Sequence, residues 1–415
     1  MPSSISRRNL LLATGATCLV PLLTTRRAGA QDRARLAGQD EIGLSVVETP
    51  YYNIHTDLQD ELLVREAGLR MTAMAEEYTR RTRGFTQQAT PTGMRFYLMS
   101  SQDTYRQVGG LPGTAGIFQQ SRSATGQIER KLMAFMRGNS YDARKATWRT
   151  VQHEGFHQFS YLAIGGRKPA WMEEGLAECF EVAEWCGDSF VVGLIPPERV
   201  QQIHRLLERN AAIPFERIMT VSRADWNSAL SSEAYLQSWS MVHFLLYADN
   251  GRWLPMFEEF LKAVQRGVNW IEAWKSSFGL PQQFAEVWLN YWRNTAPEAT
   301  VAAYIEATLR KLTTFFARSR LSGDTFGDLS TFTAAASRKA ITIHRDAWLP
   351  PGLLDEAIAE VNRYANAGMR FTLVDGENNQ PDLAAIFPDG KRILARWYRG
   401  NEKPIDRIET RYIGS

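Results

Sequence analysis

The segment His153-Glu154-Gly155-Phe156-His157 carries residue types at a spacing that could hold a metal ion. Two histidines four positions apart on an α-helix differ by about 40° around its axis, so both imidazole rings point to the same side. Neutral imidazole is a good zinc ligand, and such a pair supplies half of a tetrahedral site. Glu154 lies about 100° from His153, so its carboxylate is expected beside the metal, as the base for a bound water. The alternative is a pair of hydrogen-bonded core histidines on an amphipathic helix.

The segment that follows contains the acidic residues from which a third ligand could come. A helix is expected over about 143–162, and Gly165-Gly166 would end it. Pro169 can start a second helix, which reads Ala170-Trp171-Met172-Glu173-Glu174-Gly175-Leu176-Ala177-Glu178. Two helices joined by a short turn form a hairpin, so the acids of the second can face the histidines. The small residues Gly175 and Ala177 permit close helix packing.

The position of each acid around the second helix narrows the choice of ligand. Glu173 lies about 100° from Glu174 and is expected to face elsewhere, whereas Glu178 lies only about 40° away. A catalytic zinc with three protein ligands keeps its fourth position for water, so only one of these acids should bind the metal. Glu178 could instead orient a ligand histidine through its second ring nitrogen. A solvated or salt-bridged acid is the alternative for Glu178.

The HEGFH segment and the W-M-E-E-G-L-A segment at residues 171–177 together resemble a known family. They are similar to the gluzincin (thermolysin-like) clan of zinc metallopeptidases, and especially to bacterial peptidase-MA-like domains of unknown function. Members of that clan show HExxH followed by WxxEGxA, and the glutamate before glycine is the third ligand. The resemblance implies that His153, His157 and Glu174 bind one Zn²⁺ and that Glu154 is the catalytic base. It extends more weakly over about 46–292.

Other residues near this segment are weaker candidates for a role in catalysis. Tyr235 begins a helix expected over 235–247 and could donate a hydrogen bond to a developing oxyanion, although a core tyrosine is the alternative. His204 and His243 could serve the same purpose, but structural roles are favoured for both. Cys179 should point away from the metal, at about 140° from Glu174. A disulfide between Cys179 and Cys186 requires the helix to end between them, and two buried free thiols are the alternative.

The first thirty residues are expected to be an export signal. Ser6-Arg7-Arg8-Asn9-Leu10-Leu11 places two arginines directly before a weakly apolar stretch, residues 10–23, which is too short to span a membrane. The stretch is followed by Ala28-Gly29-Ala30, a small-x-small cleavage pattern. The paired arginines resemble the bacterial twin-arginine signal, and an ordinary secretory signal is the alternative. The protein is therefore expected in the periplasm or outside the cell.

The composition of the chain excludes several classes of protein. Of its 415 residues 44% are hydrophobic, which is enough for a packed core and excludes intrinsic disorder. The net charge of +3 depends on the first thirty residues, because these hold four arginines and no acid. The remainder, with 44 basic and 45 acidic residues, lacks the basic surplus of a nucleic-acid-binding protein. No other segment approaches the length of a transmembrane helix.

Periodicity along the chain indicates an α+β fold in three parts. Residues 45–141 are expected to form a small sheet with one helix, Glu61–Arg83, and residues 142–299 are expected to be mostly helical. Residues 300–415 begin with a helix and continue as a small α/β module of unknown role. In that module Pro388-Asp389-Gly390 predicts a hairpin turn. The strands of the first part are expected at Tyr51–His55, Met94–Met99, Ala115–Gln119 and Lys131–Met136.

These observations predict an exported zinc metallopeptidase that acts on a peptide or protein. The strand at Lys131–Met136 is expected to offer an exposed edge with which a substrate peptide could pair, because it directly precedes the metal helix. Two other functions remain possible on the sequence alone. One is a non-catalytic binding domain with the same fold, and the other is a zinc hydrolase of a non-peptide substrate.

Overall fold

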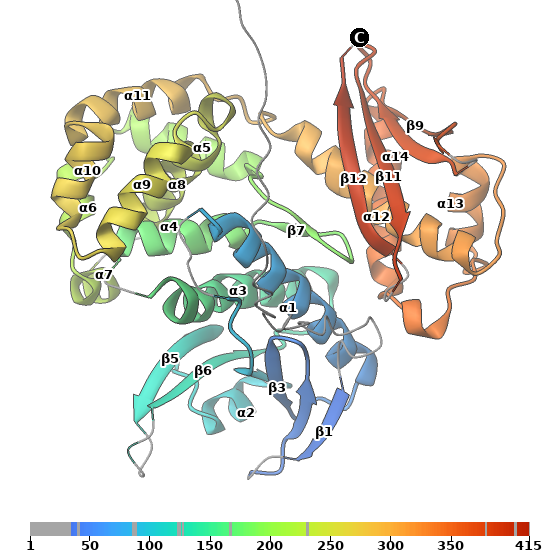
Figure 1. Ribbon diagram of the computed structural model, residues 1–415, viewed down its shortest axis with the longest axis horizontal. Helices are drawn as coiled ribbons and strands as arrows, with labels where there is room; N and C mark the ends of the chain where they lie inside the picture. The colour runs from blue at the N-terminus through green and yellow to red at the C-terminus, as the bar shows by residue number, and fades with distance from the viewer. Residues whose placement is uncertain are drawn as a thin grey trace, which may run out of the picture.

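The computed structural model describes residues 35–414 apart from eight short gaps, and for residues 35–39 and 227–229 it describes only the backbone. The expected export signal, residues 1–30, lies outside the described residues. Helices and strands are both abundant, so the expected α+β class is confirmed (Figure 1). The gaps are residues 40–41, 85–88, 123–125, 127, 166–167, 230–231, 378–379 and 402–404.

A six-stranded mixed sheet forms the first part of the chain. Its strands are paired in the order β1-β2-β3-β4-β6-β5. The β3–β4 and β4–β6 pairs are parallel and the others are antiparallel. The four expected strands are present to within a few residues, whereas the first two were not anticipated. The strands are β1 (Arg35–Gln39), β2 (Ser45–Glu48), β3 (Tyr52–Thr56), β4 (Met94–Met99), β5 (Gly116–Arg122) and β6 (Ile128–Phe135).

The strand order overturns the expectation that Lys131–Met136 offers an exposed edge. Those residues belong mainly to β6, which is paired with β4 on one side and with β5 on the other. The strand β5 forms the edge of the sheet instead. The error arose because β5 precedes β6 in the chain yet lies outside it, and strand order cannot be read from sequence order.

Helices cover both faces of this sheet. On β4, Phe96 and Leu98 pack against α1 (Glu61–Thr82) and α3 (Tyr141–Phe159). The alternate residues Tyr97 and Met99 point to the other face, where α2 (Gln102–Gln107) contributes Tyr105. The core on the first face therefore determines where α3 lies on the sheet (Figure 1).

The second part of the chain is a cluster of helices around α8 (Ser232–Gly251). The helix α4 (Ala170–Glu181) packs on α8 at Gly175, where an added Cβ would lie 2.5 Å from the carbonyl oxygen of Ser238. The small residue thus permits close packing as expected, but its partner is α8. The other elements here are β7 (Glu184–Trp185), β8 (Phe190–Val191), α5 (Pro197–Glu208), α6 (Phe215–Thr220), α7 (Arg223–Ala229), α9 (Leu254–Gln265), α10 (Trp270–Phe278) and α11 (Pro281–Asn294).

The third part combines helices with a four-stranded antiparallel sheet of order β12-β11-β10-β9. The expected hairpin is present, because β10 pairs antiparallel with β11 on either side of Pro388-Asp389-Gly390. The sheet packs against α12 and is separate from the first sheet (Figure 1). The elements are α12 (Val301–Leu321), α13 (Leu329–Ser337), α14 (Pro351–Asn366), β9 (Arg370–Val374), β10 (Asp382–Ile386), β11 (Arg392–Arg399) and β12 (Ile405–Ile413).

Two smaller expectations also have an outcome in the structure. The helix α4 ends at Glu181, between Cys179 and Cys186, but both cysteines are buried free thiols. Among the helices that the structure describes, none combines the length and the apolar composition that crossing a membrane would require.

Candidate metal centre

The helix α3 presents the two histidines from a firmly held position. Its first turn is capped by Ser140, whose hydroxyl accepts a hydrogen bond of 3.2 Å from the backbone N–H of Ala143. The helix is followed by a π-helical turn, Ser160–Ile164, and Gly165 ends it at a φ of 63°. The Lys168 amine donates hydrogen bonds to the carbonyl oxygens of Ser160 and Gly165. It thereby supplies donors to carbonyl groups at the end of the turn.

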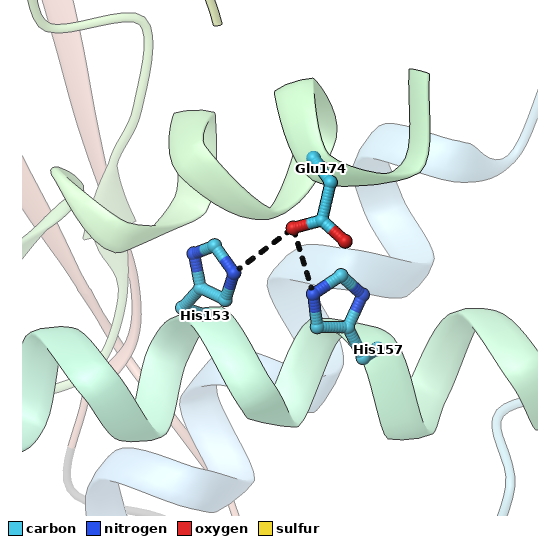
Figure 2. A group of neighbouring side chains, drawn as sticks. All are labelled: His153, His157 and Glu174. Atoms are coloured by element: carbon cyan, nitrogen blue, oxygen red, sulfur yellow. Dashed lines mark ion pairs between the residues drawn. The ribbon is translucent and has the colours of Figure 1, made fainter. Parts of the chain in front are cut away.

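The helix α4 brings Glu174 over the histidine pair. Figure 2 shows His153 and His157 rising from α3 toward one carboxylate that descends from α4. The Nε2 atom of each histidine lies 3.4 Å from the same oxygen, Oε2 of Glu174. Glu174 is only 5% exposed, so its carboxylate is held inside the protein.

This geometry fits a tetrahedral zinc ion. Zinc forms bonds of about 2.0–2.2 Å to histidine nitrogen and carboxylate oxygen, so two such ligands lie about 3.3–3.6 Å apart. The two distances of 3.4 Å fall in that range, and all three ligand atoms lie within 4.8 Å of one another. The residues present therefore fit a three-ligand zinc site.

The charges around the site favour a cation at this position. Burial lowers the pKa of His157, but the carboxylates of Glu174 and Glu173 outweigh it and raise the pKa to about 9. Burial likewise opposes the charged form of His153, yet its hydrogen bonds to Glu174 and Glu181 hold its pKa well above the usual value. Burial raises the pKa of Glu174, but the two histidines outweigh it and keep the pKa well below the usual value. The carboxylates thus stabilise positive charge between the two helices.

The second nitrogen of His153 is held by a residue that the sequence did not single out. Its Nδ1 atom lies 3.2 Å from Oε2 of Glu181 and 3.8 Å from Oε1 of Glu178. Glu181, rather than the expected Glu178, is therefore within hydrogen-bonding distance. Glu181 lies seven residues after Glu174, or two helical turns, so its position on the same face of α4 was a readable signal.

The second nitrogen of His157 faces Glu173, which was expected to point elsewhere. Its Nδ1 atom lies 3.8 Å from Oε1 of Glu173, and the Arg223 guanidinium pairs with the carboxylates of both Glu173 and Glu174. The expectation failed because it rested only on the angular positions of Glu173 and Glu174 around the axis of α4. Arg223, which comes from α7, draws the two adjacent carboxylates to one side.

Arg199 completes the ionic surroundings of the site. Its guanidinium lies 2.6 Å from Glu178 and 3.6 Å from Glu181, and it stacks on the ring of Trp239. Glu178 thus serves as the partner of an arginine. The positions of Arg199 on α5 and Arg223 on α7 could not be found from the sequence, because both are distant in sequence from the residues that they contact.

Glu154 lies between the histidine pair and the edge of the sheet. Its Oε2 atom accepts a hydrogen bond of 2.9 Å from the backbone N–H of Phe118 on β5. Its negative charge also contributes to the raised pKa of His153. A carboxylate fixed in this way, next to a candidate ligand in the chain, is suitably placed to act as a base.

Tyr235, the expected hydrogen-bond donor, lies half-buried on α8 with its ring against Trp226. Burial raises the pKa of Tyr235, and the charge of Glu174 adds to the increase, so the hydroxyl is within electrostatic reach of that carboxylate. His204 and His243, in contrast, contact the carbonyl oxygens of Trp292 and Gly193 at 2.9 and 3.1 Å. These contacts agree with structural roles for both histidines.

A cleft with a volume of about 410 Å³ opens beside Tyr235. Its walls come from α4, α5 and α8, and they include Glu178 and Arg199. The cleft thus adjoins the surroundings of His153. The lining residues are Glu178, Arg199, Gln202, Ser232, Tyr235 and Leu236.

Residues 147–266 match a family model described as a protein of unknown function, DUF1570. The matched segment contains both histidines, the glutamates of α4 and the two arginines that hold them. No curated protein matches the chain. The similarity therefore covers the candidate metal centre and attaches no activity to it.

Proposed function

We propose that this protein is an exported zinc-dependent peptidase with a gluzincin-type architecture, which hydrolyses peptide bonds in peptides or proteins. The observation that carries the proposal is the convergence of His153 and His157 on one oxygen of Glu174, at 3.4 Å from each Nε2. Glu154 beside this cluster supplies the further group that a hydrolase needs and a purely structural zinc site does not.

The chain's own residues divide the proposed reaction between them. Zinc held by His153, His157 and Glu174 would supply a Lewis acid that activates water and polarises a carbonyl group. Glu154 would accept a proton from the attacking water and deliver it to the leaving amine. The Tyr235 hydroxyl would donate a hydrogen bond to the oxyanion that develops on the substrate.

The edge strand β5 is the proposed platform for the substrate backbone. The N–H of Phe118 points away from β6, since it donates to Glu154. Backbone groups alternate along a strand, so those of Gln120 should also face outward. An extended peptide could pair with the backbone groups of Gln120 and so place a peptide bond near Glu154.

The proposal is tested by metal analysis and a peptide-library cleavage assay on the purified protein. We expect about one zinc per chain, cleavage that a chelator abolishes, and recovery when zinc is restored. Glu154→Gln keeps the shape and leaves the ligands in place, so it should retain zinc and lose activity by several orders of magnitude. Ordinary turnover by Glu154→Gln would contradict the proposed base, and zinc binding without cleavage of any peptide would contradict the peptidase function.

A further inference from the structure

The β5–β6 hairpin carries a cluster of side chains on the face of the sheet that α3 covers. Across the two strands Phe118 is paired with Leu132, and Gln120 is paired with Arg130. Side chains alternate along a strand, so these four residues lie on the same side of the sheet. It is the side that α3 covers, since Leu132 packs in the same core as Val151 of α3. Arg130 therefore lies on the α3 side, two residues along β6 from Leu132.

Tyr161 connects this face to the proposed base. It lies in the π-helical turn that follows α3, seven residues after Glu154, which is about two helical turns. The backbone N–H of Phe118 donates a hydrogen bond to Glu154, and the ring centres of Phe118 and Tyr161 are 6.0 Å apart. Phe118 thus contacts Glu154 through its backbone and Tyr161 through its side chain. Tyr161 is 39% exposed, so this contact borders the solvent.

Arg130 carries a positive charge that no carboxylate compensates. Its guanidinium lies over the ring of Tyr161, with Cζ at 5.3 Å from the ring centre. In the part of the chain that the structure describes, no carboxylate lies within 4.0 Å of this guanidinium. Of its three nitrogens only Nε is buried without a partner, which leaves the two terminal nitrogens of this half-buried side chain for a ligand. The contact with the ring orients the guanidinium but does not remove its charge.

The charges of the whole hairpin are distributed unequally between its two faces. Residues 116–135 include Arg122, Arg130 and Lys131 but only one acid, Glu129. Glu129 pairs with Lys131 at 2.8 Å, and Lys131 lies over the ring of Tyr97 in the core of the opposite face. Arg122 shares the face of Arg130, and no described carboxylate lies within 4.0 Å of it either. The face beside the proposed base therefore carries unmatched positive charge.

An extended peptide paired with Gln120 of β5 would come within reach of Arg130. It would lie about 10 Å from β6, because it would be two strand spacings away. Arginine and glutamate both have long side chains, so together they can span this distance across Gln120. Gln120 lies two residues after Phe118, whose N–H binds Glu154, so the contact would lie about two residues from the peptide bond at the base. A guanidinium offers parallel hydrogen bonds that match a carboxylate, so an acidic side chain is its best partner.

We propose that Arg130 is a specificity-determining residue, which selects peptides with an aspartate or glutamate about two residues from the cleaved bond. This inference rests on the proposed peptidase function and names the class of substrate for the same site. Tyr161 would hold the guanidinium in place, and Phe118 would connect this contact to Glu154. The carboxylate of the substrate would accept hydrogen bonds from the terminal nitrogens of Arg130.

The test compares two libraries of short peptides, acetylated and amidated at their ends, with glutamate or glutamine fixed at the central position and mixed residues elsewhere. We expect the zinc-loaded protein to cleave the glutamate library about fivefold faster or more, the upper range for a partly exposed ion pair. Arg130→Gln should bring the ratio of the two rates to about one. Arg130→Lys keeps the charge without the planar fork and should keep part of the preference. Lys131→Gln is the matched control, since Lys131 lies on the opposite face and pairs with Glu129, and it should leave the ratio unchanged.

A second measurement needs no variant. Salt screens a partly exposed ion pair, so the ratio for the wild-type protein should fall as the salt concentration rises. A ratio that does not respond to salt would contradict an ionic contact. Because the ratio compares two substrates of the same protein sample, it does not depend on how much of a variant is folded.

Several results would overturn the proposal. Equal cleavage of the two libraries by the wild-type protein, or an unchanged ratio in Arg130→Gln, would show that Arg130 does not select an acidic side chain. A preference for peptides with a free C-terminus, in place of one for glutamate, would show that a chain terminus is recognised instead. If neither library is cleaved, the proposed peptidase function fails. Fluorescence anisotropy of the same labelled libraries then decides the inference separately, and equal affinity for both would contradict it.

Discussion

At the residue scale, negatively and positively charged side chains alternate around Glu174 in the candidate metal centre. One oxygen of this carboxylate faces both histidines, and Arg223 pairs with the other. Each histidine in turn has a carboxylate near its second nitrogen. Such outer contacts fix the orientation of imidazole ligands and raise their basicity. The arrangement explains why so many charged side chains are buried in one place.

Glu181→Gln should weaken zinc binding about 10–100-fold, which is typical when the partner of a ligand histidine is lost. The amide can still accept a hydrogen bond but no longer carries the charge that supports His153. Glu178→Gln is the matched control on the same helix, because Glu178 lies farther from His153 and pairs mainly with Arg199. Competition with a chromogenic zinc chelator measures both affinities. A larger loss in Glu178→Gln than in Glu181→Gln would reverse the assignment.

At the scale of elements, the site depends on two contacts, between α3 and the sheet and between α4 and α8. The first places Glu154 beside β5, and the second places Glu174 above the histidines. Both contacts are close: an added Cβ at Gly116 of β5 would lie 2.6 Å from Cγ2 of Thr150 on α3, and one at Gly175 of α4 would lie 2.5 Å from the carbonyl oxygen of Ser238 on α8. A substitution at the α4–α8 contact should therefore affect stability, and a substitution in β5 should affect substrate binding.

Gly175→Ala should lower the free energy of unfolding. The new Cβ would lie 2.5 Å from a carbonyl oxygen of α8, and overpacking of this kind costs about 1–3 kcal/mol. The better helix propensity of alanine offsets about 1 kcal/mol of that cost. Gly352→Ala, in the first turn of α14 with no atom within 4 Å, is the control and should be neutral or stabilising. Urea unfolding measures both, and an unchanged Gly175→Ala midpoint would disprove the close contact.

Gln120→Pro should impair peptide cleavage without unfolding the protein. Proline removes one outward N–H from β5, and an edge strand tolerates proline where its N–H faces solvent. Gln120→Ala keeps that N–H and serves as the control. We expect kcat/KM to fall about tenfold or more in the proline variant only, since one substrate hydrogen bond is lost. Equal activity of the two variants would remove β5 from the substrate path.

At the scale of the whole molecule, a buried lysine joins the C-terminal part to the part that contains the candidate metal centre. Lys311 on α12 is 1% exposed and lies 3.0–3.7 Å from Glu184 of β7 and from Glu356 and Glu360 of α14. Burial lowers the pKa of Lys311, but these carboxylates outweigh it and raise the pKa above its usual value. The lysine therefore stays charged and ties the three elements together.

Lys311→Met should destabilise the protein by about 3–5 kcal/mol, because it leaves buried carboxylates without their cation. Lys262→Met is the control, since Lys262 is a half-exposed lysine paired with Glu259 on α9, and it should change stability by less than about 1 kcal/mol. Denaturant unfolding checks both. A separate early transition in Lys311→Met would show that the C-terminal part detaches first, whereas wild-type stability would contradict the proposed tie.

The sequence by itself determined the local elements and the identity of the ligand candidates. Apolar spacing located α1, α3 and β4 closely, and the helical repeat placed His153 and His157 on one face. The sequence could not determine that β5 lies outside β6. Nor could it determine that Glu181 rather than Glu178 approaches His153, or that Arg199 and Arg223 belong to the site. Local periodicity describes one element at a time, whereas these contacts join residues that are distant in sequence or depend on how side chains adjust to one another. Only the packing of α4 against α8, and of α3 against the sheet, decided which charges meet.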